Sequence, residues 1–194
     1  MKTALFNRSC YSLLDSLLTP EKIVKLAKEK NYEAVGVCDL GFLGYAPSFI
    51  KACQNNNIKP LFLMEVNVRD EDNIYPYVLL AKDDYGFHNL IALSSYLNTK
   101  EKVIDFNLLA KYLDHNFLII FSDNCPFASD GDFDFDKAKK YYEAKKSYDI
   151  IYALADLNYH SNRIALNNFY IFLKERGARL IAAHRCFYEK EKDY

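Results

Sequence analysis

Apolar residues recur along the chain in short runs of the length of a buried strand. The first such runs are residues 3–6, 34–37 and 61–68. Parallel strands that are covered on both faces read as nearly continuous apolar runs of this kind. Further runs of the same character are residues 77–81, 117–121, 150–154 and 180–183. We therefore expect about seven strands.

Stretches with apolar residues at helical spacing lie between these runs. Thr19 and Pro20 mark one helix start, because threonine caps a first turn well and proline suits the first helical position. A long helix over residues 161–176 is expected to stop at Gly177, since glycine readily takes the left-handed backbone that ends a helix. Further helices are predicted at residues 47–54, after Asp84 and at residues 137–146.

The alternation of strand and helix indicates the fold class. Repeated βα units build a mainly parallel sheet with helices on its outside, so we expect an α/β protein. No linker-like stretch interrupts the series, and 194 residues are enough for one sizeable core. We therefore expect residues 1–194 to form a single domain. The pattern alone does not separate an open sheet from a barrel.

Composition excludes several classes of protein. A net charge of −1 gives no bulk signal for nucleic-acid binding, and 15% aromatic residues favour a packed interior over disorder. No apolar run approaches the roughly 20 residues that span a bilayer. We expect a cytoplasmic protein with no signal peptide and no membrane contact. The five cysteines are scattered without a CxxC pair, which predicts free thiols rather than disulfides or a cysteine-rich zinc site.

Several segments carry a more specific signal. Residues 8–15 read Arg-Ser-Cys-Tyr-Ser-Leu-Leu-Asp, and residues 38–44 read Cys-Asp-Leu-Gly-Phe-Leu-Gly. Residues 57–66 read Asn-Ile-Lys-Pro-Leu-Phe-Leu-Met-Glu-Val, and residues 79–90 read Leu-Leu-Ala-Lys-Asp-Asp-Tyr-Gly-Phe-His-Asn-Leu. In this order they resemble the PHP (polymerase and histidinol phosphatase) domain of bacterial DNA polymerase III alpha subunits. Residues 180–188, Leu-Ile-Ala-Ala-His-Arg-Cys-Phe-Tyr, continue the resemblance.

The resemblance implies a fold and the place of a site. PHP domains are distorted (β/α)7 barrels, so we expect this architecture here. Their site lies at the carboxyl ends of the strands, as in other βα barrels. In intact members it holds a trinuclear metal centre of His, Asp and Glu ligands, which polarises a phosphodiester and generates hydroxide.

Carried over position by position, the resemblance leaves this site incomplete. The retained carboxylates are Asp15, Asp39 and Glu65. The ligand positions that have changed are Phe6, Arg8, Leu40, Arg185 and Phe187, and His184 stands beside them at a position where the family has Asn. We expect a pocket with no metal and no catalytic residue, in which Arg8 or Arg185 pairs with a carboxylate, because arginine stays protonated. The alternative is one weakly bound Mg²⁺ on the three carboxylates.

Other candidate ligands fit simpler interpretations. His88, His115 and His160 fall on predicted helices or helix ends and are expected at the surface. The acidic residues 130–136 suggest calcium, but Phe135 stands where an EF-hand needs glycine. A solvated loop leading into the next helix is the preferred interpretation. The lysines of the helix at 137–146 are expected on a solvated face.

Taken together, the resemblance implies the N-terminal PHP domain of a replicative DNA polymerase III alpha subunit, excised from a much longer chain. The parent would be a DNA-directed DNA polymerase that uses Mg²⁺ in domains absent here, whereas this segment would need no cofactor. Its expected partners are the remainder of the alpha subunit, a proofreading exonuclease subunit, and DNA through the parent enzyme. Two alternatives remain: an active metal-dependent phosphoesterase or 3′–5′ exonuclease of the PHP family, and a stand-alone enzyme resembling histidinol phosphatase.

Overall fold

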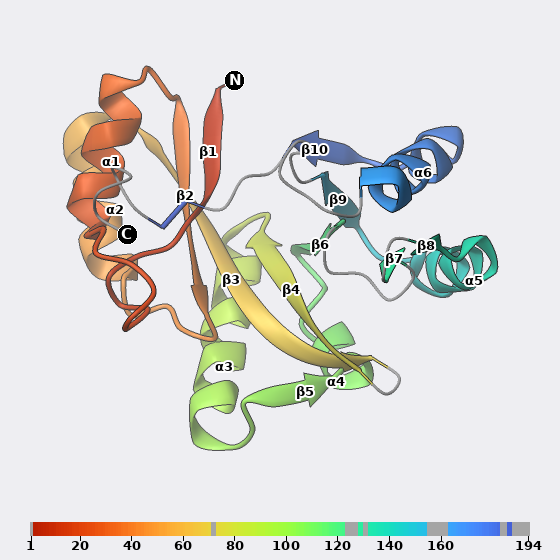
Figure 1. Cartoon of the computed structure of the whole chain (residues 1–194). Helices are drawn as coiled ribbons and strands as arrows, with labels where there is room; N and C mark the ends of the chain where they lie inside the picture. Colours follow the sequence, from red (N-terminus) through yellow and green to blue (C-terminus); the bar gives the residue numbers. More distant parts are fainter. Residues whose placement is uncertain are drawn as a thin grey trace.

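The computed structural model describes residues 2–70, 73–122, 128–129, 132–154, 163–182 and 186–187. Helices and strands alternate along this part of the chain (Figure 1). Their order is β1 (Thr3–Asn7), α1 (Pro20–Glu29), β2 (Ala34–Leu40), α2 (Ala46–Asn56), β3 (Lys59–Asp70), β4 (Asn73–Ala81), α3 (Asp84–Thr99), β5 (Val103–Asp105), α4 (Phe106–Ala110), β6 (Asn116–Phe121), β7 (Ala128–Ser129), β8 (Asp132–Phe133), α5 (Phe135–Lys145), β9 (Ile150–Leu154), α6 (Arg163–Glu175) and β10 (Leu180–Ala182).

One large sheet organises the molecule. Its strand order is β1-β2-β3-β4-β6-β9-β10, with β5 paired to the far end of β3, and β7 and β8 form a separate ribbon. All neighbours on the main path pair in parallel except those of β4, which runs antiparallel to both β3 and β6. The expected α/β class is confirmed. The regular βα alternation is interrupted at β4, because a short hairpin joins it to β3 and such a connection reverses the chain.

The sheet curls so that the end of the described chain returns to its first strand. Cys186 bridges Asn7 in parallel, donating its N–H to the carbonyl of Phe6 at 2.8 Å and accepting from the N–H of Arg8 at 2.9 Å. In Figure 1, α1 and α2 lie side by side beyond the first strands, and α5 and α6 lie together beyond β9 and β10. The result is a curled α/β half-barrel with its helices outside.

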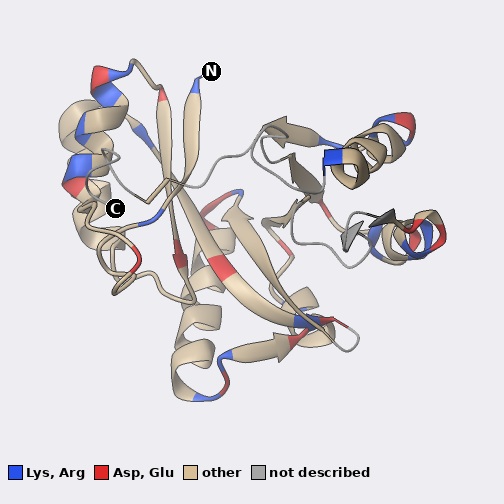
Figure 2. Ribbon diagram, in the orientation of Figure 1, with Lys and Arg blue, Asp and Glu red and all other residues tan. Residues whose placement is uncertain are grey.

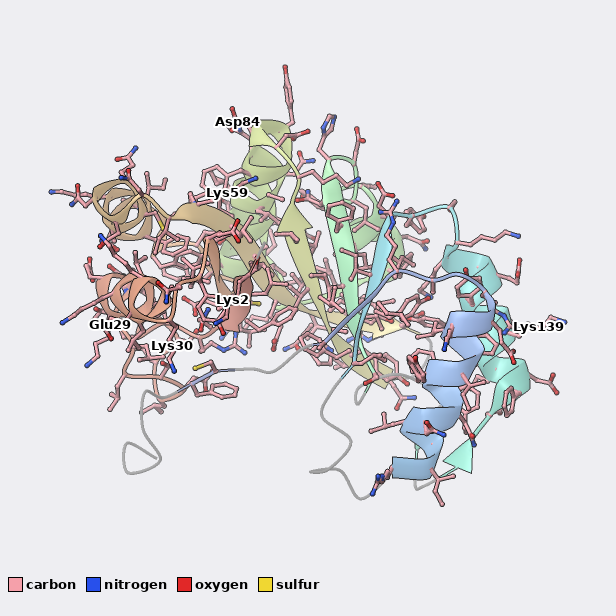
Figure 3. The ribbon with its side chains drawn as sticks, turned by 90° about the horizontal axis from the view of Figure 1, so that it is seen from above. Lys2, Glu29, Lys30, Lys59, Asp84 and Lys139 are labelled. Atoms are coloured by element: carbon pink, nitrogen blue, oxygen red, sulfur yellow. The ribbon has the colours of Figure 1, made fainter. Side chains whose placement is uncertain are left out.

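Alternating side chains of the strands divide the core in two. One cluster lies between sheet and helices and includes the fully buried side chains of Tyr45, Phe49 and Phe169. The other consists of strand residues alone and fills the opposite face: Phe6, Cys38, Leu63, Val78, Ile119, Phe121 and Ala153. The concave side of the sheet is therefore packed with apolar side chains, and charged residues such as Glu29 and Lys139 project from the outside of the helices (Figure 3).

Local sequence signals account for the element ends. Thr19 caps α1, accepting the N–H of Lys22 at 3.3 Å, and Pro20 is its first residue, as predicted. The predicted stop after α6 is confirmed, since Gly177 has a φ of 63°. The short elements β5, α4, β7 and β8 were not predicted, because segments of two to five residues hold too few positions to show a period.

A close approach at Gly86 gives a test of this packing. A Cβ atom there would overlap the carbonyl oxygen of His115, which belongs to rigid backbone. We expect Gly86→Ala to lower the free energy of unfolding by about 1–3 kcal/mol, measured by urea denaturation. Gly44→Ala is the matched control, because its Cβ would meet the ring of Phe42, which is 39% exposed and free to move aside. Equal losses in the two variants would contradict the packing described here.

Candidate functional site

The parallel strands β1, β2 and β3 bring the motif residues together at their carboxyl ends. Arg8 follows β1 directly, Asp39 and Leu40 end β2, and Leu40 pairs in register with Glu65 of β3. Figure 2 shows acidic residues within β2 and β3, in strands that are otherwise mostly uncharged. Segments far apart in sequence therefore meet at one end of the sheet, which is where the family site was expected.

A buried arginine lies at the centre of this end. Arg8 is 7% exposed, and its Nη2 lies 3.2 Å from Oε2 of Glu65, which is also buried. Its Nη1 donates to the carbonyl of Cys38 at 2.8 Å, and its Nε lies 3.8 Å from Oδ2 of Asp15. The guanidinium also faces the ring of Phe187, with 5.9 Å to the ring centre. The predicted pairing of an arginine with one of the three carboxylates is confirmed for Arg8.

The electrostatics of this arrangement keep Arg8 charged. Burial by itself lowers the pKa of Arg8, because it disfavours the charged form. Attraction to Glu65 and to Cys38, together with the hydrogen bond to Glu65, outweighs that effect, so the pKa lies above its ordinary value. The protein therefore holds a permanent cation among the strand ends.

Asp39 is bound to a different partner. Its Oδ1 accepts the N–H of Ser9 at 2.8 Å, and its Oδ2 accepts the Ser9 hydroxyl. Burial raises the pKa of Asp39 above its ordinary value, although the hydrogen bonds from Ser9 and the attraction to Arg8 act in the opposite direction. The sequence analysis did not identify Ser9 as a site residue. Its position directly after Arg8 was the feature that could have indicated this role.

The remaining positions of the expected pocket are apolar or lie on its rim. Phe6 is buried and meets Phe121 edge to face at 4.9 Å, whereas Leu40 is 45% exposed. His184 and Arg185 lie outside the described residues. The pocket, which we call the Arg8 pocket, is lined by Phe6, Arg8, Cys38, Glu65, Phe121 and Phe187. The space left inside it is about 10 Å³, which is about the room one water molecule needs.

No group of three or more His, Cys, Asp or Glu side chains in the described part of the chain is placed to hold a metal ion. His88 donates through Nδ1 to the carbonyl of Asp84, 2.7 Å away, on the exposed side of α3. His115 is exposed as well, and the hydrogen bond that it donates to the Asp83 carboxylate raises its pKa. His160 lies outside the described residues. The two described histidines are surface residues, as predicted.

Asp134 has a structural role in the acidic stretch. Its Oδ1 accepts the N–H of Lys137 at 2.9 Å, so it caps α5. A helix follows this stretch as predicted, but the solvated loop is corrected in part, because Asp132 and Phe133 form β8 and Phe133 packs against Phe169 and Phe172. Residues 130 and 131 lie outside the described part. The cysteines Cys10, Cys38, Cys53 and Cys186 form no disulfide, and Cys125 is outside the described residues.

A second buried cation corrects one prediction. Lys145, expected on a solvated helix face, is 6% exposed, and its Nζ lies 2.9 Å from Oδ2 of Asp70. Tyr77 donates to the same Asp70 oxygen at 2.8 Å, and the Tyr77 and Tyr141 hydroxyls form a hydrogen bond. The Lys145 ammonium also lies 3.8 Å from the Tyr141 ring centre. Tyr141 lies one turn earlier in the same helix, but Asp70 comes from a distant strand, so the local sequence pattern did not predict the ion pair.

The family follows from a comparison with sequence families. The PHP domain family matches residues 5–171. The match covers most of the chain, so this protein belongs to the PHP domain family. Among solved structures, a putative metal-dependent phosphoesterase from Bifidobacterium adolescentis aligns with a TM-score of 0.65 over 96% of this chain and 88% of that one, at 10% identity. A two-domain protein from Bacteroides vulgatus, described as containing a predicted PHP-like metal-dependent phosphoesterase, aligns with a TM-score of 0.66 over 100% of this chain and 54% of that one, also at 10% identity. At such identities the likeness concerns the fold alone.

Within the family, the chain is related to DNA polymerase III alpha subunits. The alpha subunit of Staphylococcus aureus strain MRSA252 is 40% identical over 115 residues, which are 58% of this chain and 11% of the relative. The alpha subunit of Aquifex aeolicus strain VF5 is 38% identical over 123 residues, or 53% of this chain and 10% of the relative. The aligned part is thus about a tenth of these relatives. None of the helices described here has the length and apolar character needed to cross a membrane.

The Arg8–Glu65 pair gives a direct test of the site. Removing one partner of a buried ion pair leaves the other charge uncompensated, so Arg8→Met should lower the free energy of unfolding by about 3–5 kcal/mol. Adding Glu65→Gln to that variant should restore part of the loss. Arg179→Met is the control, because Arg179 is exposed and its 3.4 Å pairing with Asp149 should be worth about 1 kcal/mol or less. Similar losses for both arginines in urea denaturation would rule out a buried pair.

The raised pKa of Asp39 predicts a pH dependence. When folding raises the pKa of a carboxyl group, its contribution to stability is complete below the unfolded pKa and is lost as the pH rises through the folded pKa. Asp39→Asn removes this titration and leaves an oxygen to accept the Ser9 N–H. The unfolding free energy of the variant, relative to wild type, should therefore rise as the pH is taken from below 3.8 to neutral. Urea denaturation at both pH values measures it, and a flat or falling difference would contradict the assignment.

Proposed function

We propose that this chain is the N-terminal PHP domain of a replicative DNA polymerase III alpha subunit, and that it acts there as a metal-free structural and docking module. The observation that carries the proposal is the guanidinium of Arg8, which lies buried against Glu65 at a former ligand position. The proposal includes a cytoplasmic location and a distorted (β/α)7 barrel as the complete fold. Three physical arguments support it.

Charge is the first argument. Two unit charges about 4 Å apart interact by roughly 4 kcal/mol at an effective dielectric of 20, and a divalent ion doubles this. A metal ion on Glu65 would lie close to the guanidinium 3.2 Å away and would be repelled by it. Glu65 interacts with Arg8, so a cation is already present where a metal would otherwise be needed.

Donor geometry is the second argument. A multinuclear centre needs several carboxylates and imidazoles converging on each ion. Both oxygens of Asp39 accept hydrogen bonds from Ser9, and Asp15 lies beside Arg8 with its side chain 49% exposed. The retained carboxylates are therefore engaged within the protein, Asp39 with Ser9 and both Glu65 and Asp15 with Arg8.

Space is the third argument. The Arg8 pocket retains about 10 Å³, because Phe6, Phe121 and Phe187 line it together with the arginine. A phosphodiester substrate with its metal ions needs far more room, since small-molecule sites typically measure about 300–1,000 Å³. The side chains that replace the ligands also fill the volume.

In the parent enzyme, the chemistry would belong to other domains. DNA synthesis would use Mg²⁺ held outside residues 1–194, and DNA would be reached through the parent. This domain would pack against the remainder of the alpha subunit and offer a surface to a proofreading exonuclease subunit. The 40% identity to a DNA polymerase III alpha subunit supports this assignment.

A second candidate is a metal-dependent phosphoesterase or 3′–5′ exonuclease. It is favoured by the fold likeness to the putative metal-dependent phosphoesterase from Bifidobacterium adolescentis and by the three retained carboxylates. Metal bound to those carboxylates would have to displace Arg8.

The two candidate functions predict different effects when a retained carboxylate is replaced by its neutral amide. In the full-length polymerase, Asp39→Asn and Glu65→Gln should leave the rate of DNA synthesis within about twofold of wild type, because neither carboxylate takes part in the reaction. Primer extension measures this, with a melting curve to establish that each variant folds. The 194-residue chain should contain less than one equivalent of Zn²⁺, Mn²⁺ or Fe by elemental analysis.

Retained catalysis would give a different result. Two or more metal equivalents per chain, or a 3′–5′ exonuclease activity that Asp39→Asn abolishes without a change in melting temperature, would overturn the metal-free role. One weakly bound Mg²⁺, together with an unchanged rate of DNA synthesis in the amide variants, would not amount to a nuclease site. The docking role would then still hold.

A further inference from the structure

An exposed apolar loop follows Arg8 at the carboxyl end of β1. Residues 10–18, which we call the leucine loop, present Leu13, Leu14 and Leu17 with 85%, 104% and 76% of their surface exposed. Tyr11 of the loop and Phe42 extend this surface, with ring centres 6.4 Å apart. Single exposed apolar residues are ordinary, whereas a contiguous group marks an interaction surface.

The leucine loop is held in shape by the protein beneath it. Its ends are joined by the hydrogen bond from the Cys10 N–H to the Leu18 carbonyl at 2.8 Å, and Leu18 itself is buried. Within it, the Asp15 N–H donates to Ser12 at 3.1 Å, and the Ser16 hydroxyl donates to the carbonyl of Phe187 at 2.6 Å. The exposure of the leucines thus belongs to an anchored conformation.

One leucine has a costly backbone conformation. Leu14 has a φ of 70°, in the left-handed region that L-residues other than glycine seldom adopt. Such strain persists where the surrounding structure enforces it, and it is concentrated at functional segments. Here it accompanies a side chain that is directed entirely into solvent.

The chemistry of the loop indicates what covers it. Asp15 is the one charged residue among residues 10–18. Phosphate backbones and anionic lipids are bound through lysine and arginine, so neither fits this surface. An apolar protein surface fits, with leucines and an aromatic ring as the contacts.

The position of the leucine loop indicates which protein segment covers it. The hydrogen bond from Ser16 to Phe187 places the last described part of the chain directly against the leucine loop. The relatives are about ten times as long as the aligned part. A segment tethered near the loop has a high effective concentration there, which favours it over a free partner. We infer that the leucine loop is the docking surface for the part of the same polypeptide that follows residue 194. This inference rests on the proposed function.

Hydrogen exchange tests the inference directly. Backbone amides of residues 10–18 should exchange at least tenfold more slowly in the full-length polymerase than in the 194-residue chain. Leu13→Glu combined with Leu17→Glu should return the full-length protein to the fast rate, because two buried carboxylates oppose docking. In the 194-residue chain the same pair should shift the melting temperature by about 1 °C or less, since both side chains are exposed there.

Ile164→Glu combined with Ile171→Glu is the matched control. These isoleucines of α6 are 74% and 43% exposed and lie on a different part of the molecule. The control pair should leave the slow exchange of the leucine loop unchanged in the full-length protein. If the leucine loop lost its protection from exchange in both double variants, the cause would be general destabilisation, and a docking surface at the loop would be contradicted.

Other occupants give other results, each of which overturns the inference. Equal exchange in the two proteins would mean that the loop stays uncovered. Protection in the 194-residue chain that grows with its concentration would point to a second copy, and protection that requires an added exonuclease subunit would point to that partner. The proposed function fails separately, through metal loading or nuclease activity, and neither result changes the exchange of the loop. A reading frame that ends at residue 194 would overturn both the proposed function and the inference about the leucine loop.

Discussion

The charge of one buried guanidinium constrains the whole carboxyl end of the sheet. A cation out of water needs an anion and acceptors for its N–H groups, and Arg8 finds them in Glu65 and in the carbonyl of Cys38. These partners belong to β3 and β2, so the pairing ties together the first three strands of the sheet. In the role proposed above, the Arg8 guanidinium would supply positive charge where, by resemblance, PHP domains with intact ligands hold metal ions.

The sequence predicted the elements well and their directions less well. The strand runs, the Thr19 cap and the Gly177 stop depend on local residues, and each is found where expected. The direction of β4 depends on its hairpin with β3, and an apolar run reads the same in both directions. The pairing of Arg8 could be predicted because the family resemblance places Arg8 and the carboxylates at one site, where a buried carboxylate without metal needs a partner. The attachment of Asp39 to Ser9 could not, since it depends on side-chain orientation within a buried site.

The second buried cation shows a further limit of sequence patterns. Lys145 stands in a helix with several lysines, and nothing in its neighbourhood separates it from them. Its burial results from Asp70, which meets it only when α5 packs beside the β3–β4 hairpin, and from Tyr141, one turn earlier in α5. Both buried cations of the molecule's described part, Arg8 and Lys145, pair with a carboxylate and face an aromatic ring. The two buried charges are thus stabilised by the same two kinds of contact.

The return of Cys186 to the edge of β1 has a consequence for biosynthesis. The first strand leaves the ribosome early, but its outer edge is bonded by one of the last described residues, and Ser16 and Phe187 are 171 positions apart. Contacts of such long range form late and slow the folding of a domain. Until they form, the N-terminal edge strand is open to pairing with other nascent chains. This domain should therefore depend on chaperones during translation more than a fold closed by local contacts does.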